Sequence, residues 1–69
     1  HTGGRPSQAP LGAWVFFRWG SIGHVGMMSG PALMIHQWNG GKIVESNPDT
    51  IARSLPYIGW VDFHDAVNP

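Results

Sequence analysis

Residues 22–38, which read IGHVGMMSGPALMIHQW, decide the fold that we predict for this chain. Two short apolar runs, at residues 22–28 and 32–38, flank the turn-forming sequence Ser29-Gly30-Pro31. Apolar runs of this length, bounded by glycine and proline, are typical of strands rather than helices. The stretch therefore predicts a β-hairpin with a three-residue loop.

The centre of that loop determines which residues face one another. With residue 30 at the centre, opposed positions have numbers that sum to 60, so His24 faces His36 and Met28 faces Ala32. Opposed residues project from the same face, with β-carbons about 4.5–5.5 Å apart. One imidazole could then act as a general base while the other fixes its tautomer. A loop of four residues would instead place His24 opposite Gln37 and separate the pair.

Three more strands are expected in the remaining apolar runs, at residues 13–19, 42–46 and 57–63. The sequence Asn39-Gly40-Gly41 is a strong signal for a second hairpin. Residues 47–55 predict one or two helical turns, capped by Asn47 or Asp49 and ended by Pro56. The fold class is therefore mainly β: a five-stranded antiparallel meander or half-barrel with one short helix, one face of which needs a cover.

The chain divides into one domain with two short ends. Residues 1–12 are rich in glycine and proline and predict an extended arm or linker. Residues 13–64 form the antiparallel domain, and residues 65–69 form a tail. Because the chain starts with His1 rather than methionine, we expect a processed product or an excerpt.

The composition excludes several classes of function. The chain has 69 residues, four basic and four acidic side chains and no cysteine. A neutral chain without a basic cluster does not fit nucleic-acid binding. No apolar run approaches the roughly 20 residues of a membrane-spanning helix. The charged share of 12% is low beside the about 25% of an ordinary domain, which suggests that one face is covered by more protein.

Short stretches of this sequence, in the same order, resemble the NlpC-like peptidases of bacterial cell walls. Residues 12–17 read GAWVFF where that family has G-D-L-V-F-F. Residues 23–27 read GHVGM, in which HVGM corresponds to the start of the family's H-V-G-I-Y, and residues 34–36 read MIH where the family has F-I-H-A. Residues 57–60, YIGW, are similar to a closing strand of actinobacterial NlpC and CHAP relatives. The resemblance spans about residues 11–63, and Ala13 departs from it where the family usually has aspartate.

The resemblance implies a papain-like cysteine peptidase or amidase, an α+β fold of which this chain is the β-sheet half. His24 matches the catalytic base and His36 the polar residue that orients it. The nucleophilic cysteine of the family lies upstream, at the N-terminus of a helix, and no such segment is present in this sequence. The resemblance therefore implies a second polypeptide or a missing segment with the helix and the cysteine. It also implies a peptide or peptidoglycan substrate, no cofactor, and a secreted or cell-envelope location.

Other residues have two interpretations each. If Gly40-Gly41 is a two-residue turn, Glu45 faces His36 and could orient it, as could Asn47; alternatively, Glu45 is a solvated strand-end residue. Trp38 is the tryptophan best placed for a substrate groove, although tryptophans in so small a domain are more often core residues.

The sequence is compatible with three hypotheses about function. The chain is the histidine-bearing part of a two-chain or truncated cysteine peptidase, a non-catalytic binding or inhibitor module on the same scaffold, or a small metal-binding β-domain. For the last, His24, His36 and His64 have no known ligand spacing, and no cysteine joins them, so we predict no metal site. More generally, paired histidines are often surface or core residues without a catalytic role.

Overall fold

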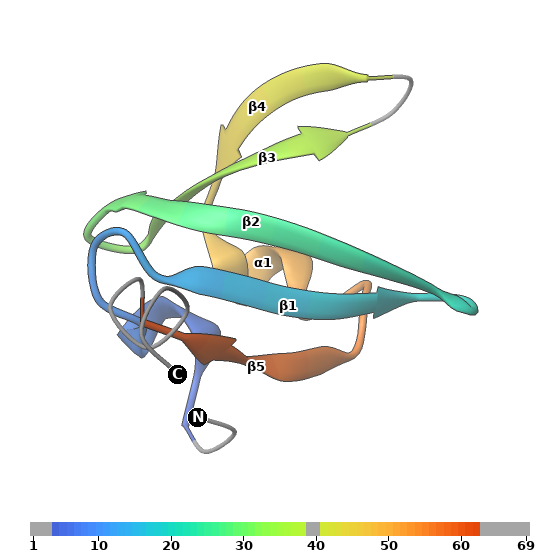
Figure 1. The fold of residues 1–69 in the computed structure, drawn as a ribbon, viewed down its shortest axis with the longest axis horizontal. Helices are drawn as coiled ribbons and strands as arrows, with labels where there is room; N and C mark the ends of the chain where they lie inside the picture. Colours follow the sequence, from blue (N-terminus) through green and yellow to red (C-terminus); the bar gives the residue numbers. More distant parts are fainter. Residues whose placement is uncertain (1–3, 39–40, 63–69) are drawn as a thin grey trace.

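The computed structural model describes residues 4–38 and 41–62, which form one antiparallel sheet of five strands (Figure 1). The strands are β1 (Trp14–Trp19), β2 (Ile22–Gly30), β3 (Leu33–Trp38), β4 (Lys42–Ser46) and β5 (Tyr57–Val61). The 3-10 turn η1 (Pro6–Gln8) precedes them, and helix α1 (Pro48–Ile51) lies between β4 and β5. The predicted fold class is confirmed: the protein is mainly β with one short helix, and the sheet does not close into a barrel.

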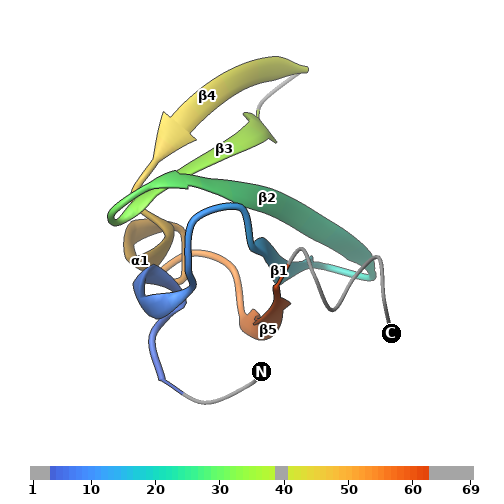
Figure 2. The same cartoon turned by 60° about the vertical axis from the view of Figure 1, so that its left-hand side comes forward.

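The strand order β4-β3-β2-β1-β5 differs from a simple meander in the place of the last strand. The first four strands are neighbours in sequence order, whereas β5 pairs with β1 at the opposite edge from β4. The segment with α1 makes this crossing on the concave side of the sheet, as the turned view shows (Figure 2). Its local sequence defines the helix: Asn47 caps the start, accepting a hydrogen bond from the backbone of Asp49, and Pro48 stands in the first turn.

The hydrophobic core lies between the concave face of the sheet and these covering segments. Because side chains alternate along a strand, the odd-numbered residues of β1 and the even-numbered residues of β2 and β3 point to this face. Buried hydrophobic residues from the sheet, α1 and the N-terminal segment form one cluster: Ala9, Ala13, Val15, Phe17, Met28, Met34, Ile51 and Leu55.

Residues 4–12 differ from the predicted extended arm or linker. Pro6 and Ala9 are buried, and η1 contacts α1 and β5. The side chain of Asp49 accepts two hydrogen bonds from Ser7, at 3.0 Å from the backbone nitrogen and 2.6 Å from the hydroxyl. Glycine and proline are typical of linkers, but here two apolar side chains and this polar clamp fix the segment against α1.

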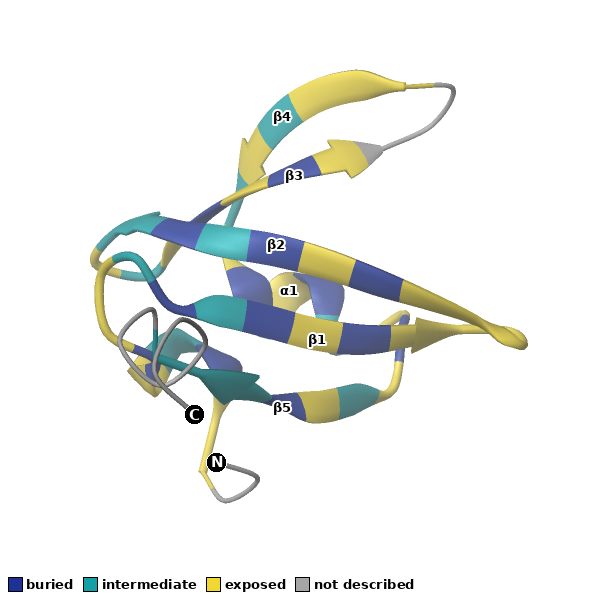
Figure 3. Ribbon diagram, viewed as in Figure 1, coloured by how far each residue is buried: buried dark blue, intermediate teal, exposed yellow. Residues whose placement is uncertain are grey.

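Buried and exposed residues alternate along β1 and β2, so the opposite face of the sheet is partly open to solvent (Figure 3). Residues there with more than a third of their surface exposed include Phe16, Val25, Ile35 and Ile43. The predicted need for a cover is thus met on the concave face by α1 and η1, while the described residues leave this second face uncovered. None of the described helices has the length and apolar character needed to cross a membrane.

Candidate functional site

The two histidines of the predicted pair are in direct contact on the concave face of the sheet. Nε2 of His24 and Nδ1 of His36 lie 2.9 Å apart, a hydrogen-bond distance. The rings are almost perpendicular, with an interplanar angle of 86°. Both residues are buried, with exposed fractions of 9% for His24 and 3% for His36.

The register that produces this contact differs from the predicted one by two residues. His36 faces Gly26 rather than His24, and Met28 faces Met34 rather than Ala32. Two features cause the difference. The turn is tighter and displaced toward β3, because β2 continues to Gly30, which faces Leu33, and Ala32 takes the bend with a φ of 55°. A bulge between Met28 and Gly30 then shifts the register back by one residue. A shift of two residues keeps every side chain on its face, so the histidines meet diagonally instead of directly.

Gly26 makes room for this diagonal contact. It stands directly opposite His36 and, on β2, between His24 and Met28 on the same face. A β-carbon there would overlap the side chain of Met34, which is fully buried. A side chain at this position would therefore compete with the packing on which the histidine pair rests.

Ser46 extends the histidine pair by one more polar group. Its hydroxyl oxygen lies 2.9 Å from Nε2 of His36, so both ring nitrogens of His36 have hydrogen-bond partners. In the register of β3 and β4, His36 faces Val44 and Ser46 faces Met34, so this contact is diagonal too. His24, His36 and Ser46 thus form an oblique line across three adjacent strands.

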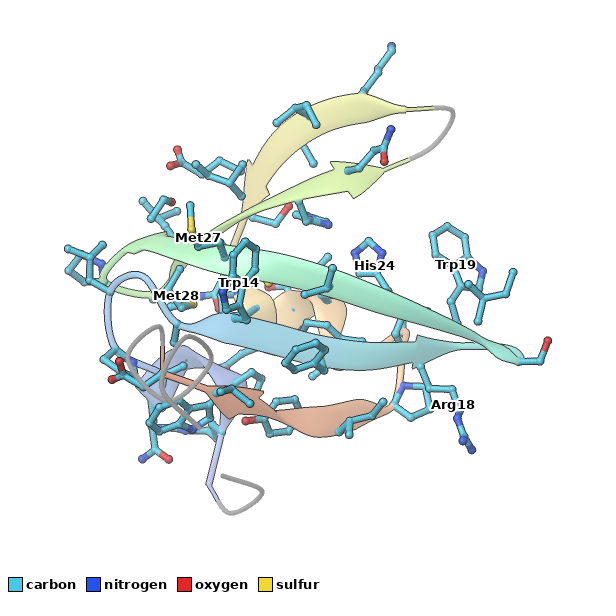
Figure 4. All side chains as sticks on the ribbon, viewed as in Figure 1. Trp14, Arg18, Trp19, His24, Met27 and Met28 are labelled. Atoms are coloured by element: carbon cyan, nitrogen blue, oxygen red, sulfur yellow. The ribbon has the colours of Figure 1, made fainter. Side chains whose placement is uncertain are left out.

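Two aromatic rings flank His24. The ring centroids of Phe17 and His24 are 6.2 Å apart, and those of Trp19 and His24 are 5.8 Å apart in an edge-on arrangement. Figure 4 shows His24 and Trp19 next to each other where β2 and β3 diverge, beyond their last described pair, Gly26 and His36. Trp19 remains 45% exposed, so the site lies at the border between core and solvent.

Burial makes both imidazoles weaker bases than a histidine in water. Desolvation lowers the pKa of His24, because a charged ring loses hydration there. Desolvation also lowers the pKa of His36, and the neighbouring His24 lowers it further by charge repulsion. At neutral pH the pair is therefore uncharged, the state in which an imidazole can accept a proton.

The predicted orienting role of Glu45 is wrong. Glu45 faces Ile35, and Val44 takes the predicted place opposite His36. The register of β3 and β4 differs by one residue from the register that a two-residue turn would give, and a slip of one residue moves a side chain to the other face. The Glu45 carboxylate instead accepts a hydrogen bond of 2.8 Å from the Ser29 hydroxyl, on the exposed face. Asn47, the other candidate, serves as the cap of α1.

Two remaining candidates, Trp38 and His64, fall partly or wholly outside the described residues. Trp38 ends β3 opposite Lys42, but its side chain and the whole of His64 lie outside the described part of the structure. Of the other tryptophans, Trp60 packs against the core and Trp14 is half-buried on the opposite face. Within residues 4–38 and 41–62, no three acidic, histidine or cysteine side chains are grouped so that they could hold a metal ion.

The contacts of Phe17 with His24 and of Ser46 with His36 were not predicted from the sequence. A two-residue turn at Gly20-Ser21 gives the observed register of β1 and β2 and would have placed Phe17 opposite His24. No pattern in the sequence pointed to Ser46, because its contact with His36 depends on the register of β3 and β4.

The arrangement can hold one imidazole in a fixed orientation and tautomer and let it exchange a proton. It contains no nucleophile, since the chain has no cysteine and the hydroxyl of Ser46 is bonded to His36 rather than to His24. No protein-family model matches this chain, and neither a curated protein nor a solved structure matches it.

Proposed function

We propose that this chain is the histidine-bearing part of a papain-like cysteine peptidase or amidase, with the nucleophilic cysteine supplied by another polypeptide or segment. His24 is the base, and His36 orients it. The observation that supports the proposal is the buried hydrogen bond of 2.9 Å between the two imidazoles. It occurs between the two residues that the resemblance to NlpC-like peptidases assigns to these roles.

The geometry suits a base that acts through Nδ1. Since Nε2 of His24 is bonded to His36, a thiol would exchange its proton with Nδ1. The contact with His36 restricts rotation of the ring, as the third member of a catalytic triad does. The rings of Phe17 and Trp19 lie beside His24 and shield it there from bulk water.

The proposed chemistry is hydrolysis of an amide bond in two steps. The cysteine thiolate forms a bond to the carbonyl carbon, and His24 gives its proton to the departing amine. Water then attacks the thioester, His24 takes a proton from that water, and the thiol is regenerated. The net reaction consumes one amide and one water and yields an acid and an amine.

The substrate class and location follow the resemblance alone. We propose peptide bonds of peptidoglycan stem peptides next to D-amino acids, and a secreted or cell-envelope enzyme. The low charge of the chain, with 12% charged residues, fits a protein that is partly covered by another segment.

The test is to purify the chain from its source cells under native conditions and to assay hydrolysis of synthetic stem peptides. We expect a cysteine-bearing polypeptide in the same complex, and loss of hydrolysis when iodoacetamide alkylates that cysteine. The His24→Ala variant should abolish hydrolysis while the complex stays intact. Val25→Ala is the matched control, because Val25 is the next residue, is 45% exposed and points to the opposite face.

Three results would contradict the proposal. Purification of the chain as a stable monomer without any thiol partner would favour a binding or inhibitor module. Hydrolysis by an intact His24→Ala complex at the rate of the Val25→Ala control would show that His24 is not the base. Hydrolysis that is lost on chelation and restored by zinc would favour a metal-dependent β-domain.

A further inference from the structure

The hydrogen bonds of His36 have two neutral arrangements, which differ in the role of Ser46. In the first, Nε2 of His24 donates to Nδ1 of His36, and Nε2 of His36 donates to the Ser46 hydroxyl oxygen. In the second, all directions are reversed: Ser46 donates to Nε2 of His36, and Nδ1 of His36 donates to Nε2 of His24. A hydroxyl can donate or accept, so both arrangements satisfy the two observed distances.

The two arrangements leave His24 with its proton on different nitrogens. A neutral imidazole carries one proton, so in the first arrangement this proton is on Nε2 and the lone pair is on Nδ1. In the second arrangement the proton is on Nδ1, and His24 cannot accept a proton from a thiol there. The direction of the bond at Ser46, two strands away from His24, is thus coupled to whether His24 can act as a base.

We propose that Ser46 accepts the hydrogen bond from Nε2 of His36 and thereby holds His24 in the tautomer that has its lone pair on Nδ1. Ser46 is then a positioning residue that acts through His36. The catalytic meaning of this inference rests on the proposed function, but the hydrogen-bond directions are properties of the chain itself.

Two features favour this direction. Both imidazoles are then in the Nε2–H form, which is the more stable tautomer of a neutral histidine side chain in water. Ser46 is half-buried, so its own hydroxyl hydrogen is free to turn toward solvent while its oxygen accepts from His36. The reversed arrangement requires the less stable tautomer at two adjacent histidines.

The proposed direction also needs no rearrangement when His24 takes up a proton. Protonated His24 still donates from Nε2 to Nδ1 of His36, and His36 still donates to Ser46. In the reversed arrangement, His24 could be protonated only if His36 first changed its tautomer, because two N–H groups would otherwise point at each other. If Ser46 accepts the hydrogen bond from His36, His24 can therefore gain and lose its proton while both hydrogen bonds stay in place.

The experiment is nuclear magnetic resonance of the chain with ¹⁵N-labelled histidine, which distinguishes protonated from unprotonated ring nitrogens. At pH above the titration of the pair, we expect His24 and His36 both to be protonated on Nε2. Ser46→Ala should convert this single tautomer into a mixture at His36 and His24. Ser46→Thr keeps a hydroxyl and should restore the single tautomer, and Ser29→Ala removes a hydroxyl from the other face and should leave it unchanged.

A wild-type chain with His24 protonated on Nδ1 would overturn the inference without any variant. A folded Ser46→Ala chain whose histidines keep the wild-type tautomers would overturn it too. If Ser46→Ala does not fold, the wild-type tautomers and the Ser46→Thr chain decide the question. None of these measurements needs the cysteine-bearing partner, so failure of the proposed function would leave their outcome unaffected.

Discussion

The two faces of the sheet each carry a hydrogen bond from β4, at consecutive residues of the chain. On the concave face Ser46 bonds to the buried His36, at 2.9 Å, and on the opposite face Glu45 bonds to Ser29, at 2.8 Å. The lengths are similar, but the surroundings differ, because the Glu45 contact is exposed and competes with water. A hydrogen bond that is buried and belongs to a connected network is therefore expected to contribute more than an exposed bond of the same length.

The largest expected difference between the faces is in catalysis. In the complex with the cysteine-bearing partner, His24→Ala should lower the rate of amide hydrolysis by about 10²–10⁴-fold, the range of general acid–base catalysis. Val25→Ala on the other face should leave the rate unchanged. Steady-state kinetics with one stem peptide compares them, and equal rates would remove the distinction between the faces.

The next difference is in packing, and adjacent methionines provide a matched pair. Met28 is 1% exposed on the concave face, whereas Met27 is half-buried on the other. Met28→Ala should lower the free energy of unfolding by about 2–5 kcal/mol, the usual range for a truncated core side chain. Met27→Ala should cost clearly less. Urea unfolding of both variants tests this, and similar losses would mean that the uncovered face is packed as well as the core.

The packing of residues 4–12 against α1 should depend on Asp49. Hydrogen bonds from Ser7 lower the pKa of its carboxyl group, so the charged form is favoured in the folded protein. Its contribution to stability is therefore present above the unfolded pKa of about 3.9 and is lost as the pH falls through the folded pKa. At pH 7, Asp49→Ala should cost about 1.5–3 kcal/mol, as for hydrogen bonds to charged groups.

The exposed neighbour Thr50 supplies the control for Asp49, because Thr50→Ala removes a side chain from the same helix without touching Ser7. Thermal unfolding at pH 7 compares the two variants. An Asp49→Ala chain as stable as the Thr50→Ala chain would show that the N-terminal segment is not fixed by this clamp.

The histidine pair predicts a second loss of stability in acid, at higher pH than that of Asp49. Burial lowers the pKa of both His24 and His36, so the unfolded chain binds protons more readily than the folded one. Stability should therefore fall as the pH drops below the unfolded value of about 6.5. A double His24→Gln, His36→Gln variant keeps His1 and His64 and should lose less stability between pH 7.5 and 5.5. An equal loss would assign the effect to the other two histidines.

The smallest expected difference compares two serines. Ser46→Ala leaves a buried imidazole nitrogen without this partner and should cost about 1–2 kcal/mol. Ser29→Ala loses an exposed bond to Glu45 and should change stability by no more than about 0.5 kcal/mol. Paired unfolding curves measure the difference, and a larger loss for Ser29→Ala would reverse the ranking of the faces.

The sequence predicted the five strands, the short helix and a pair of histidines on one face, since these depend on apolar runs, glycine and proline. His24 and His36 meet although their register was wrong, because a slip of two residues preserves the face. A slip of one residue does not preserve the face, so Glu45 lies on the exposed face and Ser46 on the concave face with His36. The strand order at β5 and the packing of residues 4–12 depend on contacts far apart in the chain, which local patterns do not encode.

The role proposed for His24 is tested most directly on the thiol that it should activate. The rate at which iodoacetamide alkylates the partner's cysteine is followed against pH, in complexes with the wild-type chain and with His24→Ala. With the wild-type chain, we predict reaction at pH values well below the about 8.5 at which an ordinary thiol ionises. With His24→Ala, the profile should return to that of an ordinary thiol. Identical profiles for the two complexes would contradict the assignment of His24 as the base.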